Sequence, residues 1–95
     1  MFVILLKFSH NKSQAGRLME GHNAWIQSGF DDGVFLTVGS LKPDAGGAIL
    51  ALASNLDEIQ SRMQADPFVA EGVVSAEILE ITPNRADDRL EFLFG

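Results

Sequence analysis

The chain has 95 residues, of which 46% are hydrophobic and 21% are charged, as is typical of one small globular domain. Thirteen acidic residues against seven basic ones give a formal net charge of -6, which disfavours nucleic acid and anionic membrane surfaces as partners. There is no cysteine, so disulfides, thiolate zinc sites and cysteine nucleophiles are excluded.

The first predicted element is a strand over Phe2–Phe8, within the apolar opening "MFVILLKF", and its nearly continuous apolar residues predict that both of its faces are buried for most of its length. This apolar run is too short to span a membrane. It also lacks the basic region and the small-residue cleavage site of a signal peptide. We therefore expect a soluble, cytoplasmic protein.

A helix is predicted next, from about Gln14 to Ser28, with Gly29 as its stop signal. The side chains that fall on one stripe at helical spacing are Ala15, Leu18, Met19, His22, Trp25 and Ile26. The side chains that fall off this stripe are Arg17, Glu20, Asn23 and Gln27.

The middle of the chain predicts two strands joined by a loop. The first strand is "VFLTVGSL" at 34–41, the loop is "KPDAGG" at 42–47, and the second strand is "AILALA" at 48–53. Both strands are nearly continuous apolar runs, which predicts that both of their faces are buried.

Two helix starts follow. Asn55, with Glu58 three residues later, resembles a capping box and predicts a helix that ends near Ala65. Asp66 stands directly before a proline, which is a strong N-cap signal and predicts a short helix over 67–71.

The last strand is predicted over 73–81, where the apolar alternation slips so that Leu79 and Ile81 flank Glu80. The slip predicts a β-bulge or a change of buried face. The element order is thus β-α-β-β-α-β, which predicts an α+β, ferredoxin-like fold. In this fold, two helices cover one face of a four-stranded antiparallel sheet.

The other face of the predicted sheet needs a cover, and a second protomer would provide it. Residues 84–95 form a C-terminal tail in which a charged linker leads to Leu90, Phe92, Leu93 and Phe94. These apolar groups would be exposed in a monomer. We therefore expect 1–95 to be a single domain that forms a homodimer or higher homo-oligomer, with the tail packing at the interface.

His22 and Asp66 are the candidates for chemistry, and each has two interpretations. His22 is either a half-buried side chain bonded to backbone or a general acid and base that faces a cavity. Asp66 either caps a helix or orients an imidazole, and one carboxylate has enough lone pairs to do both. The residues alone leave these alternatives open.

The other constellations are weak. The loop "GSLKPDAGG" lacks the Gly-Lys-Ser/Thr ending of a phosphate loop, so it is either a mobile connection or a lid over a pocket. Ser40 has no nucleophile-elbow pattern around it. His10 and His22 do not have metal-ligand spacing. We therefore expect no metal, nucleotide or redox cofactor.

Several segments together, in this order, resemble the YciI-like (YCII-related) family over residues 1 to 83. These segments are "FVILLKF", "HNAW" from His22, "GVFLTVGSL" before a glycine-rich loop, "DPFVAEGVV" and "AEILEITP". The resemblance implies a dimeric α+β barrel built from ferredoxin-like protomers.

The resemblance also implies a site in which His22 pairs with Asp66 as a catalytic dyad. Asp66 would hold the imidazole and stabilise its protonated form. Ser40 would line the pocket and Phe68 would close it, and we expect Trp25 on the pocket wall as well.

Two kinds of function fit these residues. The first is an enzyme, an isomerase or a lyase such as a dehydrochlorinase, that moves a proton on a small cyclic or carbonyl compound through His22 and Asp66. The alternative is a non-catalytic module that binds an unknown small molecule or serves as a structural dimer. The dyad favours the first, whereas the short chain and its apolar tail favour a structural partner.

Overall fold

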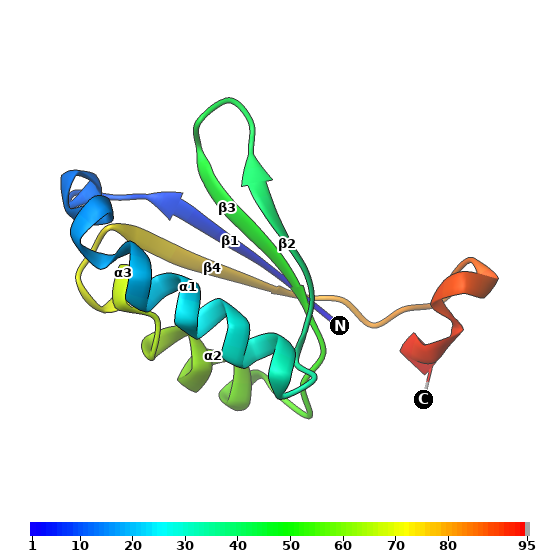
Figure 1. Cartoon of the computed structure of the whole chain (residues 1–95). Coiled ribbons are helices and arrows are strands. Elements are labelled where there is room, and N and C mark those ends of the chain that lie inside the picture. The colour runs from blue at the N-terminus through cyan, green and yellow to red at the C-terminus, as the bar shows by residue number, and fades with distance from the viewer. Residues whose placement is uncertain (95) are drawn as a thin grey trace.

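A computed structural model describes residues 1–94 of the chain. The elements in chain order are β1 Phe2–Phe8, η1 Lys12–Gln14, α1 Ala15–Asp31, β2 Phe35–Leu41, β3 Gly46–Ala51, α2 Leu56–Gln64, α3 Pro67–Ala70, β4 Val74–Glu80 and η2 Asp88–Phe94. The strands form one antiparallel sheet in the order β2-β3-β1-β4, and α1 and α2 lie on one side of it (Figure 1). The predicted ferredoxin-like α+β fold is confirmed.

The core lies between the helices and the inner face of the sheet. Alternate residues of the central strand β1 point into it, so that Phe2, Ile4 and Leu6 are all buried. Ile4 pairs with Ile49 on β3 and with Ile78 on β4. This period-two alternation shows that β1 has one buried face in the protomer, rather than two.

The outer face of the sheet carries apolar side chains without a helix over them. Val3 is the neighbour of Leu50 on one side and of Leu79 on the other. Leu79 is 46% exposed. Because side chains alternate along a strand, these three form an apolar row across the face opposite the core.

Helix α1 is longer than predicted, and Gly29 lies inside it rather than at its end. A Cβ atom on Gly29 would overlap the ring of Phe35, so the glycine lets this ring pack directly against the helix. The turn that follows uses Gly33, which has a φ of 72°. The prediction of Gly29 as the stop signal was wrong, because close packing and not chain reversal requires this glycine.

Of the two alternatives that the slip in the last strand predicted, the β-bulge was wrong. The pairing of β1 with β4 runs without a shift from Phe2 opposite Glu80 to Phe8 opposite Val74. Leu79 is simply an apolar residue on the outer face. The sheet irregularity instead lies between β2 and β3, at Phe35 and Thr37.

Asn55 and Asp66, the two predicted capping residues, stand at the N-termini of α2 and α3. Asn55 Oδ1 accepts a hydrogen bond from the Glu58 N–H at 2.9 Å, and Glu58 Oε2 accepts one from the Ser54 N–H at 3.2 Å. This arrangement resembles a capping box, except that the Glu58 carboxylate accepts from the N–H of Ser54, the residue before the N-cap, instead of from the N–H of the N-cap residue Asn55. Asp66 caps α3 with its side chain, as described below.

The tail runs away from the sheet and helices and ends in η2 (Figure 1). Phe92 is 49% exposed and Phe94 is 55% exposed. The Arg89 side chain and backbone N–H donate hydrogen bonds to Asp87, which holds the pKa of that carboxyl below its ordinary value. Within residues 1–94, no helix is long and apolar enough to cross a membrane.

Candidate functional site

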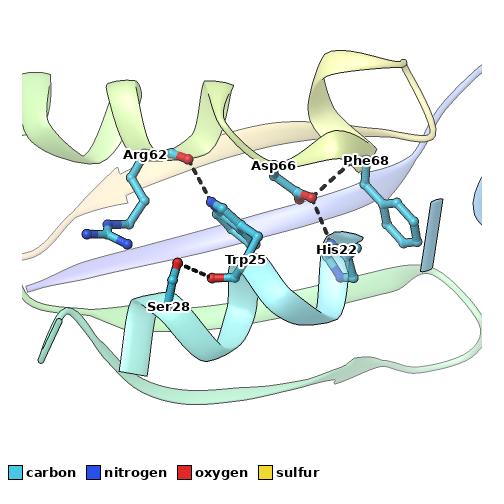
Figure 2. A network of polar contacts seen from close by, with 6 residues as sticks. All are labelled: His22, Trp25, Ser28, Arg62, Asp66 and Phe68. Carbon is cyan, nitrogen blue, oxygen red and sulfur yellow. Dashed lines mark hydrogen bonds and ion pairs between the residues drawn. The ribbon is translucent and has the colours of Figure 1, made fainter. Parts of the chain in front are cut away.

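His22 and Asp66 meet between α1 and the junction of α2 with α3 (Figure 2). His22 Nδ1 lies 2.8 Å from Asp66 Oδ1, and the two side chains are 12% and 0% exposed. An ionised carboxylate only accepts hydrogen bonds, so Nδ1 is the donor in this contact. In the neutral imidazole, Nε2 therefore carries the free lone pair.

Asp66 is held in place by the start of α3. Its Oδ1 also accepts a hydrogen bond from the Phe68 N–H at 3.0 Å, which is the N-cap contact. Oδ2 is buried and has no protein hydrogen-bond partner. One carboxylate oxygen thus both starts a helix and contacts the imidazole, so the backbone of α3 fixes the direction from which Asp66 reaches His22.

Aromatic rings fix the plane of the His22 imidazole. The Phe68 ring is stacked on it at a centroid distance of 3.9 Å and an interplanar angle of 4°. The Trp25 ring lies 5.9 Å away at an angle of 25°. The contact with Asp66 fixes which edge of the imidazole faces the carboxylate, and the stacked Phe68 ring fixes the plane of the imidazole. Together they leave the His22 ring little freedom to turn.

Trp25 is not on the cavity wall, contrary to the prediction. Its indole Nε1 donates a hydrogen bond to the carbonyl of Arg62 on α2 at 2.9 Å (Figure 2). Its ring lines a separate, shallow hollow between the two helices with Ser28 and Arg62. Trp25 turns toward α2 because its N–H finds a partner there, and it thereby joins the helix of His22 to the helix that precedes Asp66.

A cavity of about 410 Å³ lies between α1, α3 and the inner face of the sheet. Its lining includes three of the predicted site residues, His22, Ser40 and Phe68. Apolar side chains form most of the remaining wall, namely Leu6, Phe8, Ala15, Met19, Ile26, Val38, Ile49 and Val74. The cavity thus combines a polar imidazole with an otherwise apolar surface, as small-molecule sites commonly do.

One cavity residue was placed differently by the sequence pattern. Asn23 lines the cavity, although the helical stripe left it out. Met19, which the stripe includes, also lines it. Ala15, Met19 and Asn23 are four residues apart and so share one line along α1. The four-residue spacing was the signal in the sequence that could have placed Asn23 on the cavity wall. The spacing alone does not show whether the helix face that carries Asn23 meets a cavity or solvent.

Other titratable groups lie apart from this site. His10 is exposed, and its ring packs against Gly72. In the part of the chain that the structure describes, no group of three or more His, Asp or Glu side chains is placed to hold a metal ion.

A family model for the YCII-related domain matches residues 1–83. The chain belongs to this family. A solved structure, the 5-chloro-2-hydroxyhydroquinone dehydrochlorinase from Burkholderia phenoliruptrix AC1100 in complex with 2,5-dihydroxybenzoquinone, is similar in fold, with a TM-score of 0.69 and 15% sequence identity. The similarity covers 86% of this chain and 94% of that one. No curated protein sequence matches the chain.

Proposed function

We propose that this YCII-related protein is an enzyme that moves a proton on a small cyclic or carbonyl compound, with His22 as general base and acid. The observation that carries the proposal is the buried contact between His22 Nδ1 and Asp66 Oδ1 beside a cavity that His22 lines. This contact leaves Nε2 as the basic nitrogen. A similar fold in a dehydrochlorinase supports elimination as one form of the reaction.

In an elimination, a chlorinated hydroxyhydroquinone reacts as its diketo tautomer, in which the C–Cl carbon and its neighbour are sp³ carbons. Nε2 of His22 takes a proton from the sp³ carbon next to the C–Cl carbon. The electron pair of the broken C–H bond forms a C=C bond, and chloride leaves the adjacent carbon with the electron pair of the C–Cl bond. The imidazolium then releases its proton to solvent, so that the net loss is HCl. In an isomerisation, the imidazolium instead returns the proton to another atom of the substrate.

Asp66 supports either reaction through charge and position. Its carboxylate stabilises the imidazolium that forms when Nε2 is protonated, and it keeps Nδ1 as the donor. Because Asp66 is wholly buried, water does not screen this contact from its side. Asp66 is therefore a positioning residue, and His22 is the residue that would touch the substrate.

Turnover of chlorinated hydroxyhydroquinones, halogenated hydroxyquinones and enol lactones tests the proposal. We expect wild-type protein to release chloride or isomerise at least one of them. His22→Gln should lower kcat by about 10²–10⁴-fold, which is the range for loss of a general acid–base group. Asp66→Asn retains an oxygen that can cap α3, and it should lower kcat while the fold persists.

His10→Gln is the matched control, because His10 is the other histidine of the chain and is exposed outside the cavity. It should leave kcat unchanged. Equal rates for wild type and His22→Gln would remove His22 from the mechanism. Ligand binding without turnover in wild type would instead identify a binding module.

We also propose that the protein acts as a homodimer through the outer face of the sheet. The supporting observations are the apolar row of Leu50, Val3 and Leu79 and the exposed phenylalanines of η2. Sedimentation of the wild type should give a dimer, which Leu79→Lys and deletion of residues 88–95 should each weaken. An unchanged dimer after the deletion would exclude the tail from the interface.

A further inference from the structure

The cavity wall is poor in charge. Apart from His22, the lining residues whose side chains have groups able to form hydrogen bonds are Asn23 and Ser40. Among the lining residues of the described chain there is no lysine or arginine. A ligand group that enters this cavity therefore meets amide, hydroxyl and imidazole groups, but no permanent cation.

The dyad does not supply a net positive charge either. When the imidazole is neutral, the pair of His22 and Asp66 carries the charge of the Asp66 carboxylate. When Nε2 is protonated, the imidazolium and the carboxylate 2.8 Å away cancel each other. A ligand carboxylate or phosphate would thus lose hydration without gaining a counter-charge, which is unfavourable in an apolar cavity.

Basic side chains near the cavity are already engaged. The Lys12 ammonium stands 4.3 Å from the ring centroid of Phe8, a lining residue, and lies 3.1 Å from Asp44 Oδ2. Arg17 donates to Gln14 at 2.9 Å and lies 3.8 Å from Glu71. Each cation thus has a carboxylate of the chain beside it, so neither presents an unmatched charge.

We propose that the cavity selects an uncharged, ring-sized hydroxyl or carbonyl compound against carboxylates and phosphates, and that Met19 sets this preference. The inference rests on the proposed function of the same site. A cavity of about 410 Å³ lies toward the small end of the roughly 300–1,000 Å³ typical of ligand pockets. Asn23 and Ser40 match hydroxyl and carbonyl substituents.

Met19 occupies the decisive position. It lines the cavity three residues before His22 and four before Asn23, on the same side of α1, and it is 42% exposed. A long cationic side chain at this place would reach the cavity while its stem stayed at the solvent boundary. The thioether of Met19 keeps this part of the wall neutral and apolar.

A pair of ligands of nearly equal shape tests the preference. Isothermal titration calorimetry under argon at neutral pH compares 2,5-dihydroxybenzamide, which is neutral, with 2,5-dihydroxybenzoate, which is anionic. We expect the wild type to bind the benzamide at least about tenfold more tightly. Equal or tighter binding of the benzoate would overturn the proposal, and so would a failure to bind either ring.

Substitutions at Met19 test its role. Met19→Arg should raise the affinity for the benzoate by about tenfold, whereas Met19→Gln, which adds polarity without charge, should retain the preference of the wild type. The same affinities for Met19→Arg and Met19→Gln would remove Met19 as the determinant. Lys12→Met should leave benzoate binding unchanged, and a loss of that binding would show that Lys12 serves as an anion contact.

These binding results are separable from the test of catalysis. A cavity that prefers the benzoate, in a protein whose turnover needs His22, would overturn the substrate class and retain the proposed reaction. A cavity that prefers the benzamide, in a protein without His22-dependent turnover, would retain the substrate class and overturn the proposed reaction.

Discussion

The two ends of the inner sheet face differ sharply, although the same helix α1 crosses both. The closed end is formed by Trp25, Gly29, Phe35 and Ile59, all of which are buried. There the Phe35 ring meets the Trp25 ring edge-on at 5.1 Å. The hollow end is the part that encloses the cavity, with Met19, His22, Val38, Ser40 and Gly47 among its walls.

Residue size explains this difference. At the closed end, Gly29 on the helix lets an aromatic ring from β2 pack against α1. At the hollow end, the glycine is on the sheet: Gly47 pairs with Leu6 and Ser40 on the inner face and contributes no side chain. His22 lines the cavity, while Asp66 and the stacked Phe68 ring hold its imidazole in place. A general base needs both conditions.

Removing the same side chain from each end should give the largest difference in stability. Ile59 is 0% exposed at the closed end, whereas Ile26 lines the cavity. Ile59→Ala should lower the free energy of unfolding by about 2–5 kcal/mol, and Ile26→Ala by clearly less, because the latter only enlarges an existing space. Urea unfolding measures both. Equal losses would mean that the two ends are packed alike.

Adding one methyl group to each of two glycines of α1 should change stability in opposite directions. Gly29→Ala overlaps the Phe35 ring and should destabilise by about 1–3 kcal/mol. A methyl group on Gly16 would meet no packed neighbour within 4 Å, so Gly16→Ala should stabilise by up to about 0.5 kcal/mol through helix propensity. Thermal unfolding of both variants measures the signs, and a stabilised Gly29→Ala would refute the close packing.

Filling the hollow end should affect binding more than stability. Gly47→Val places a side chain on the inner face and should weaken binding of 2,5-dihydroxybenzamide by about tenfold, with a stability change of about 1 kcal/mol. Gly39→Val is the matched control. The Gly39 backbone also borders the cavity, but Gly39 pairs with Ala48 on the outer face, so its new side chain would extend into open space on that face. If both variants bind like the wild type, the cavity is not the binding site.

The sequence determined the features that depend on near neighbours along the chain. The apolar run of Phe2–Phe8, the cap at Asn55 and the Asp-Pro start at Asp66 each predicted an element that the structure contains. The hydrogen bonds of a cap and the period of a strand involve residues only a few positions apart. The order of these elements then predicted the ferredoxin-like fold, and family resemblance directed attention to His22.

Only the tertiary structure decided how distant residues meet. It placed Gly29 inside α1, turned Trp25 toward α2, put Asn23 on a cavity wall and brought His22 Nδ1 to 2.8 Å from Asp66 Oδ1 across 44 positions of sequence. The helical period states which residues share a face, but not whether that face meets a ring, another helix or an open space. That outcome depends on the side chains of every element packed around α1, which no local pattern contains.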